Sequence, residues 1–128
     1  MKKEVFIIDD DPIYRIIVSK TIGKLDSSLI INECENGEIG LAELENLKNS
    51  SHEIIVLLDI NMPVVNGWGF LIAIEKNNFF NLEKLRIYMI SSSIDQSDKV
   101  KAEQYTFLKG FYHKPLTNED LKLIIGID

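Results

Sequence analysis

Residues Ile54–Leu58 form a run of five consecutive branched apolar side chains that ends at Asp59. A strand that is apolar on both faces belongs in the middle of a parallel sheet, because helices then cover both faces. The rest of the chain alternates further short apolar segments with stretches of helical character. The pattern predicts an α/β fold, a doubly wound five-stranded parallel sheet with helices on both faces. The other expected strands are Glu4–Ile8, Leu29–Cys34, Arg86–Ile90 and Gly110–His113.

Helix signals lie between these strands. Asp11 is a candidate N-cap, and Pro12 follows it at the first helical position. Ile13, Ile16 and Ile17 then recur on one side of the expected helix, the pattern of an amphipathic helix. The other expected helices are one around Ile39–Leu47, Trp68–Lys76, Asp95–Leu108 and Thr117–Ile125. Trp68 is expected to cover the sheet, and the helix over Asp95–Leu108 is mostly polar. Thr117 and Asp120 are expected to form a capping box at the start of the last helix.

Length and charge narrow the class of protein. The 128 residues carry 45% hydrophobic and 27% charged side chains, which fits one globular domain over residues 1–128, and we expect no second domain. A net charge of −6 would repel a polyanion, so we expect no direct nucleic-acid binding. No apolar run approaches the roughly 20 residues of a membrane helix, so we expect no membrane contact. The single cysteine, Cys34, is expected to be buried, and a cytoplasmic location is the natural expectation.

The chemistry-bearing residues follow the ends of the expected strands, which is where open α/β sheets bind ligands. Asp9 and Asp10 follow the first strand, and Asp59 ends the third. Carboxylates brought together in a cleft repel one another unless a cation intervenes, and hard oxygen ligands suit Mg²⁺. Ser91 after the fourth strand and Lys114 after the fifth are suited to bind phosphoryl oxygens. The set predicts transfer of a phosphoryl group onto an aspartate.

Each of these signals has an ordinary alternative. An acidic run after a strand is usually a solvated loop, a serine triplet is often a turn, and Lys-Pro is often a surface loop. Their joint placement in strand order favours a site. An enzyme of the haloacid-dehalogenase type would need a second aspartate two residues after Asp59, where this chain has Asn61. The chain also lacks the glycine-rich motifs of nucleotide-binding proteins.

Five motifs, in order, resemble the receiver domain of two-component response regulators. This resemblance extends over essentially the whole chain and implies a flavodoxin-like fold with strand order 2-1-3-4-5. It also implies a protein that is a phosphoacceptor and not an enzyme. The motifs are Val5–Pro12, Leu57–Pro63, Asn66-Gly67, Met89–Ser92 and Lys114-Pro115.

The resemblance implies a role for each residue of the site. Asp59 would be the phosphoacceptor, and Asp9 and Asp10 the acidic pair. Asp10 and Asp59 would be direct ligands of Mg²⁺, and Asn61 would offer its backbone carbonyl to the metal. The hydroxyl of Ser91 would follow the phosphoryl group, and the ammonium of Lys114 would pair with that group. Phe111 would be the aromatic switch residue.

The implied function is a switch that signals by protein–protein contact. A sensor histidine kinase or a histidine phosphotransfer protein would donate the phosphoryl group, and the surface of the fourth helix, fifth strand and fifth helix would then change. Asn61 and Ser93 are expected to tune the lifetime of the phosphate. Two alternatives stay open, a phosphate carrier in a phosphorelay and a receiver-like module that only binds partners. A weak homodimer also stays open.

Overall fold

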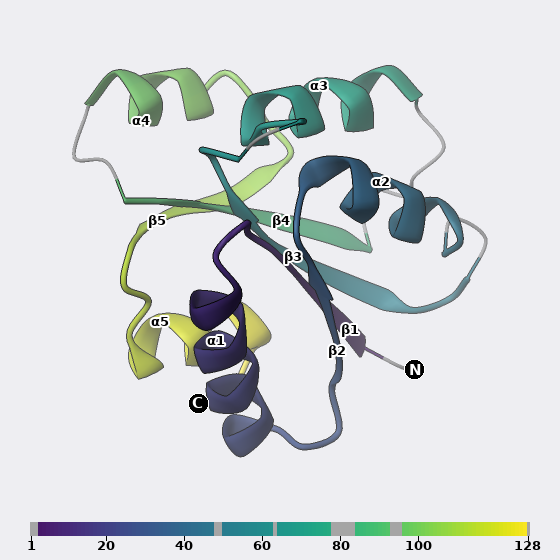
Figure 1. Ribbon diagram of the computed structural model, residues 1–128, viewed down its shortest axis with the longest axis vertical. Helices are drawn as coiled ribbons and strands as arrows, with labels where there is room; N and C mark the ends of the chain where they lie inside the picture. Colours follow the sequence, from purple (N-terminus) through teal and green to yellow (C-terminus); the bar gives the residue numbers. More distant parts are fainter. Residues whose placement is uncertain (1–2, 48–49, 63, 78–83, 93–95, 128) are drawn as a thin grey trace.

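The computed structural model describes residues 3–47, 50–62, 64–77, 84–92 and 96–127. Five strands form one parallel sheet in the order β2-β1-β3-β4-β5, as predicted. Helices α1 and α5 cover one face of this sheet, and α2, α3 and α4 cover the other (Figure 1). The strands are β1 (Lys3–Ile8), β2 (Ile30–Cys34), β3 (Glu53–Asp59), β4 (Leu85–Ser91) and β5 (Leu108–His113), and the helices are α1 (Pro12–Leu25), α2 (Gly37–Glu45), α3 (Gly67–Asn77), α4 (Gln96–Ala102) and α5 (Asn118–Ile125).

The central strand β3 is buried on both faces, which confirms the prediction from its apolar run. Its alternate side chains enter two separate cores. Val56 and Leu58 pack with α2 and α3, whereas Ile55 and Leu57 pack with α1 and α5. β3 pairs with β1 and β4, and its last residue, Asp59, lies opposite Ile90. The two cores fix the register of β3, because a slip of one residue would exchange all of its side chains between them.

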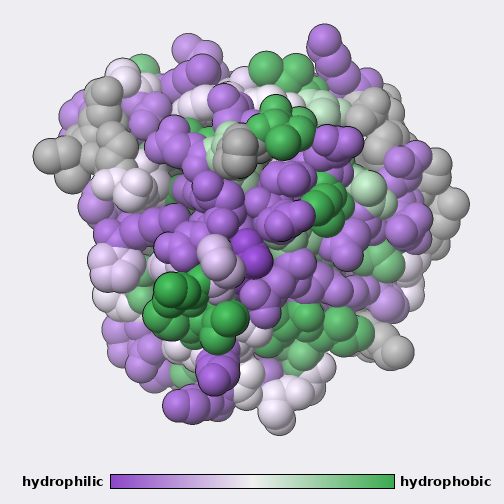
Figure 2. Space-filling model, in the orientation of Figure 1, coloured by the Kyte–Doolittle hydropathy of each residue, from purple (hydrophilic) through white to green (hydrophobic). Residues whose placement is uncertain are grey.

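Helix α1 begins as predicted but presents the other side to the sheet. The Asp11 side chain caps it by accepting hydrogen bonds from the backbone N–H groups of residues 13 and 14. Buried Val18 and Ile22 face the core. The amphipathic pattern placed the apolar side on Ile13, Ile16 and Ile17, and this was wrong as a core face, because they are 69%, 47% and 57% exposed. Figure 2 shows hydrophobic surface over α1 accordingly.

Helix α4 is shorter than predicted. It ends at Ala102, whereas the sequence suggested a helix to Leu108; the expected start, Asp95, lies outside the described residues. The chain turns after Ala102, and the backbone N–H of Leu108 donates to the carbonyl of Tyr105 at 3.1 Å. The Tyr105 ring is stacked on Trp68 of α3, with 6.1 Å between ring centroids. This contact favours the turn over further helix and frees residues 108 and 109 for β5.

Three further local predictions are confirmed. Thr117 and Asp120 form the capping box of α5. Cys34 is buried, and its thiol donates to a carboxylate oxygen of Glu43 at 2.7 Å. Trp68 is 9% exposed and belongs to the core that α3 covers. Among the described residues, no helix combines the length and apolar character needed to cross a membrane.

Candidate functional site

Three aspartates meet at the carboxyl ends of β1 and β3. Asp9 and Asp10 follow β1, Asp59 ends β3, and the two strands are neighbours in the sheet. One carboxylate oxygen from each of the three lies within 4.8 Å of those of the other two. Asp9 and Asp59 are buried, at 2% and 5% exposed, whereas Asp10 is exposed. The group is thus buried on one side and open to solvent on the other. A metal ion bound there could also contact a substrate from the open side.

The backbone holds Asp9 in place from several sides. Its N–H donates to the carbonyl of Cys34 at 3.0 Å, and its Oδ1 accepts from the N–H of Asp11 at 2.9 Å. The guanidinium of Arg15 donates from Nη1 to the Asp9 carbonyl at 2.5 Å, and its Nε lies 3.4 Å from Glu33. The end of β1 is therefore tied to β2 and to the first turns of α1.

Lys114, which follows β5, lies between two of the aspartates. Its Nζ lies 2.7 Å from Oδ2 of Asp9 and 3.6 Å from Oδ1 of Asp59. Its backbone N–H donates to the carbonyl of Ser91 at 2.8 Å, which ties the end of β5 to the end of β4. Burial alone would lower the pKa of Lys114, but the hydrogen bond to Asp9 and the charges of Asp59 and Asp9 outweigh it, so this pKa is raised. Lys114 therefore stays an ammonium ion in the site.

One ammonium does not fully compensate the buried carboxylates. Burial, followed by the charge of Asp9, raises the pKa of Asp59 from 3.8 to about 6, although Lys114 and a backbone hydrogen bond with Asn61 act against the rise. Ionised Asp59 is thus costly in the protein alone. A divalent cation would remove this cost, and the carboxylate oxygens are the donors that Mg²⁺ takes. The residues present fit a magnesium ion.

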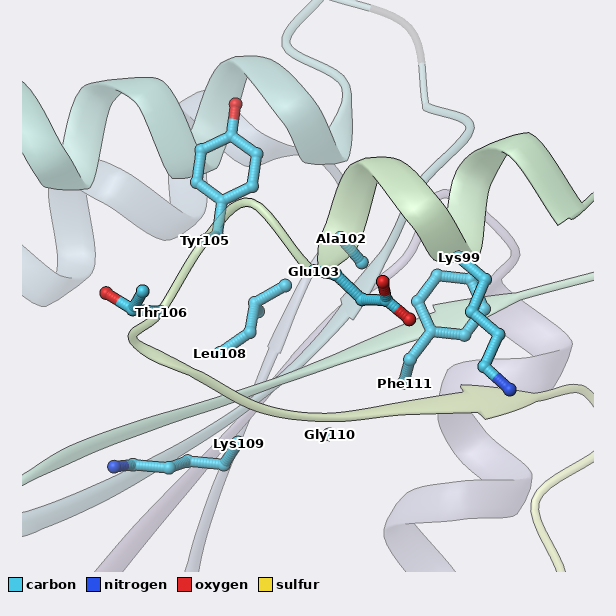
Figure 3. A pocket seen from close by; sticks show the side chains of 9 residues that line it. All are labelled: Lys99, Ala102, Glu103, Tyr105, Thr106, Leu108, Lys109, Gly110 and Phe111. Atoms are coloured by element: carbon cyan, nitrogen blue, oxygen red, sulfur yellow. The ribbon is translucent and has the colours of Figure 1, made fainter.

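Ser91 and Phe111 complete the predicted set. Ser91 is the last residue of β4, fully buried, and in register with His113 of β5. Phe111 is half-buried in β5 and lines a cavity of about 340 Å³ between α4 and β5. Its ring is turned toward α4 in that cavity (Figure 3). The sheet therefore brings Asp9, Asp10, Asp59, Ser91 and Lys114 to one edge, and Phe111 lies on β5, three residues before Lys114.

Comparison with known proteins decides the family. The response regulator receiver domain family matches residues 5–126. The chain belongs to this family. Receivers are signalling switches that interact with histidine kinases or phosphotransfer proteins and bind Mg²⁺ at an acidic pocket. In this receiver, Asp9, Asp10 and Asp59 lie close enough together to hold a metal ion.

Individual relatives are similar over most of the chain. A probable chemotaxis protein CheY of Rhizobium etli is 27% identical over 97% of this chain and 90% of its own length. The crystal structure of a two-component response regulator from Cytophaga hutchinsonii, 28% identical, superposes with a TM-score of 0.83 over 98% of this chain and 96% of its own. The nitrate/nitrite response regulator NarL of Escherichia coli is 30% identical over 91% of this chain but only 50% of its own length. The receiver thus spans about half of that relative.

Two residues near the receiver's site were not predicted from the sequence. Arg15 bonds the Asp9 carbonyl, and the ring centroid of Tyr14 lies 4.4 Å from Nζ of Lys114. Both lie in the first turn and a half of α1, directly after the acidic loop. Their position in the sequence could have indicated this, because the first side chains of a helix that begins directly after a strand lie near the end of that strand.

The two histidines do not belong to the receiver's group of three aspartates. The imidazole of His52 pairs with buried Glu4, which also accepts a hydrogen bond from Asn32 at 3.1 Å, near the amino ends of the strands. His113 is exposed, and its Nδ1 lies 2.7 Å from the carbonyl of Lys114. Both histidines are structural or exposed, as expected. Asn61 is exposed beside Asp59, and Ser93 lies outside the described residues.

Proposed function

We propose that this receiver is a phosphorylation-activated signalling switch with Asp59 as its phosphoacceptor. The observation that carries this proposal is the buried Asp59 carboxylate, within reach of two further aspartates and 3.6 Å from the ammonium of Lys114. A sensor histidine kinase or a histidine phosphotransfer protein is the donor. The receiver works in the cytoplasm as one domain over residues 1–128, and it is a phosphoacceptor that assists its own chemistry, not an enzyme.

Transfer is a displacement at phosphorus. A carboxylate oxygen of Asp59 attacks the phosphorus of a phosphohistidine, the P–N bond breaks, and the imidazole leaves with that electron pair. Asp10, Asp59 and the backbone carbonyl of Asn61 would hold Mg²⁺, with Asp9 completing the acidic pair. Bound Mg²⁺ supplies positive charge that offsets the repulsion between the carboxylates and the incoming phosphoryl oxygens. Hydrolysis returns the receiver to its unphosphorylated state. Water attacks phosphorus, the P–O bond to Asp59 breaks, and the Asp59 carboxylate and inorganic phosphate are released.

Ser91 and Lys114 would bind the new acyl phosphate. The Lys114 ammonium can move from Asp9 to a phosphoryl oxygen, since it already lies near Asp59. The Ser91 hydroxyl is a donor at the end of the adjacent strand β4. The backbone bond from Lys114 to Ser91 supports a joint response of β4 and β5 to one phosphoryl group.

The output surface is proposed to be that of α4, β5 and α5. Phe111 lies two residues before His113 on β5 and lines the cavity beside α4. When Ser91 moves toward the phosphoryl group, Phe111 moves inward, and the cavity and the surface around it change shape. A downstream protein reads this change, which is a local event that biases a two-state element.

The donor is proposed to dock on α1. The cap of α1, Asp11, directly follows the acidic pair, so the first turns of this helix form the rim of the site. Ile13, Ile16 and Ile17 are exposed on that rim, where a protein that delivers a phosphohistidine to Asp59 would bury them.

The test is the intact mass of the protein after incubation with acetyl phosphate, with and without Mg²⁺. One added phosphoryl group that requires Mg²⁺ and is absent in an Asp59→Asn variant is the expected result. An adduct that persists in Asp59→Asn would contradict the assignment of the acceptor. If no adduct forms, beryllofluoride binding separates a short-lived phosphate from a module that only binds partners.

A further inference from the structure

Lys114 has a third neighbour besides Asp9 and Asp59. Its Nζ lies over the aromatic ring of Tyr14, 4.4 Å from the ring centroid. A cation within about 6 Å of such a centroid is attracted by the negative face of the ring. The ammonium is therefore bounded by two carboxylates from the sheet and one ring from α1.

The Tyr14 ring is itself held in place. Its backbone N–H donates to the capping Asp11 side chain at 3.3 Å, so the first turn of α1 fixes its Cα beside the acidic loop. The ring is half-buried and packs on the core beneath α1 and α5, and its hydroxyl oxygen is buried. The ring is thus a fixed platform, whereas the four-carbon stem of Lys114 is flexible.

A ring is suited to this place for a chemical reason. An ion pair uses the N–H groups of an ammonium, whereas the face of a ring attracts the whole cation and leaves N–H groups for other acceptors. A further carboxylate at this position would compete for those N–H groups. It would also add negative charge where a phosphoryl group must bind. A neutral aromatic face avoids both effects.

We propose that Tyr14 is a positioning residue for Lys114: its ring holds the ammonium beside Asp59, poised for the incoming phosphoryl oxygens. The inference rests on the proposed phosphoacceptor function. Without the ring, the ammonium is restrained only by its ion pairs and spends more of its time on Asp9, the nearer of its two carboxylates, or in water. The phenol hydroxyl has no part in this role, so phenylalanine serves as well as tyrosine.

The experiment measures the rate of phosphorylation by acetyl phosphate, by intact mass, at saturating Mg²⁺. We expect Tyr14→Leu to slow the reaction roughly tenfold, within the range of about 2-fold to 30-fold that a cation–π contact corresponds to, and Tyr14→Phe to restore the wild-type rate. Tyr14→Met takes the place of Tyr14→Leu if thermal unfolding shows that the leucine variant is not folded. The wild-type rate is the reference: a wild type that is neither phosphorylated nor able to bind beryllofluoride would refute the proposed function and not the role of Tyr14.

A double-mutant cycle with Lys114→Ala separates positioning from packing. If Tyr14 acts through Lys114, then Tyr14→Leu has no further effect on the rate in the Lys114→Ala background. An equal slowing in both backgrounds would overturn the proposal, because it would mean a loss of packing that does not involve the lysine. A Tyr14→Phe variant as slow as Tyr14→Leu, or a Tyr14→Leu variant as fast as wild type, would overturn it too.

Discussion

Nζ of Lys114 lies 2.7 Å from Oδ2 of Asp9 but 3.6 Å from Oδ1 of Asp59. The lysine therefore forms its closer ion pair with an aspartate other than the proposed acceptor. In this state Lys114 compensates the buried carboxylates, and in the phosphorylated state it would neutralise the phosphoryl group. One side chain thus serves the stability of the unphosphorylated protein as well as the proposed chemistry.

The first prediction concerns this stabilising role. Lys114→Met leaves the buried carboxylates of Asp9 and Asp59 without their cation. We expect the free energy of unfolding in Mg²⁺-free buffer to fall by about 3 kcal/mol, the lower end of the cost of breaking a buried ion pair. Mg²⁺ would supply the missing charge and should narrow the difference from wild type. Urea denaturation of both proteins, with and without Mg²⁺, measures this. A loss of stability that Mg²⁺ leaves unchanged would contradict the electrostatic explanation.

A second prediction follows from the pKa of Asp59, which burial raises from 3.8 to about 6. Between these values the folded protein binds more protons than the unfolded chain, so this group makes stability fall as pH rises from about 4 to about 6, by up to about 3 kcal/mol. Above pH 6 the folded protein carries the full cost of an ionised, buried Asp59. Asp59→Asn should therefore be more stable than wild type at pH 7.5 without Mg²⁺, with a much smaller difference at pH 4.

Urea denaturation of Asp59→Asn and wild type at the two pH values isolates this group, because the other titrating residues are common to both proteins. Equal stability of the two at pH 7.5 would mean that the carboxylate is not destabilised in the folded state.

A third prediction concerns the loop between β3 and α3. Val64 has a φ angle of 70°, a region that β-branched residues rarely adopt, and it is 72% exposed. Asparagine tolerates this conformation and would lose little packing there, so Val64→Asn should raise stability by about 1 kcal/mol, or about 4 °C in Tm. Val100, 58% exposed in α4, is the matched control, and Val100→Asn should bring no gain. Thermal unfolding of both variants and of wild type measures the changes in Tm. Equal changes at both positions would exclude strain at Val64.

A fourth prediction uses the single tryptophan of the chain as a reporter. Trp68 of α3 stacks on Tyr105 in the turn after α4, and Nζ of Lys101 lies 4.6 Å from a Trp68 ring centroid. If phosphorylation changes the α4–β5 surface, these contacts change as well. Tryptophan fluorescence should therefore shift when acetyl phosphate is added with Mg²⁺. The shift should be absent in Asp59→Asn, and an unchanged spectrum of the phosphorylated wild type would argue against movement of this surface.

The sequence predicts the sheet of this protein better than the orientation of α1. The sheet and the place of the aspartates could be predicted, because an apolar run such as Ile54–Leu58, within a strict strand–helix alternation, is typical of a covered central strand. The carboxyl ends of parallel strands then meet at one edge of the sheet. The core face of α1 could not be chosen so simply. Its sequence holds two apolar stripes, one through Ile13 and Ile17 and another through Tyr14, Val18 and Ile22, and helical spacing alone does not rank them.

The contact between Tyr14 and Lys114 could not be predicted for a related reason. The two residues are 100 positions apart and come from elements on either side of the site, α1 and the end of β5. Their meeting depends on how far α1 rotates about its axis, which is the same property that buries Val18 and exposes Ile17. Sequence periodicity fixes the spacing along a helix, whereas this rotation is set by packing against the sheet.

The exposed stripe of α1 leads to the last prediction. Docking of a phosphohistidine donor would bury Ile16 and Ile17, and an aspartate in place of either would put a charge into an apolar contact. Ile17→Asp should therefore slow phosphotransfer from an autophosphorylated kinase or phosphotransfer protein by roughly tenfold or more, a cost of at least about 1.4 kcal/mol. Acetyl phosphate needs no docking surface, so phosphorylation by this small donor should keep its wild-type rate. Ile72→Asp, at a 43% exposed position on α3 across the sheet, is the matched control for an added surface charge. Slowing of both donors by Ile17→Asp would indicate damage to the site itself, and slowing of neither would exclude α1 as the docking surface.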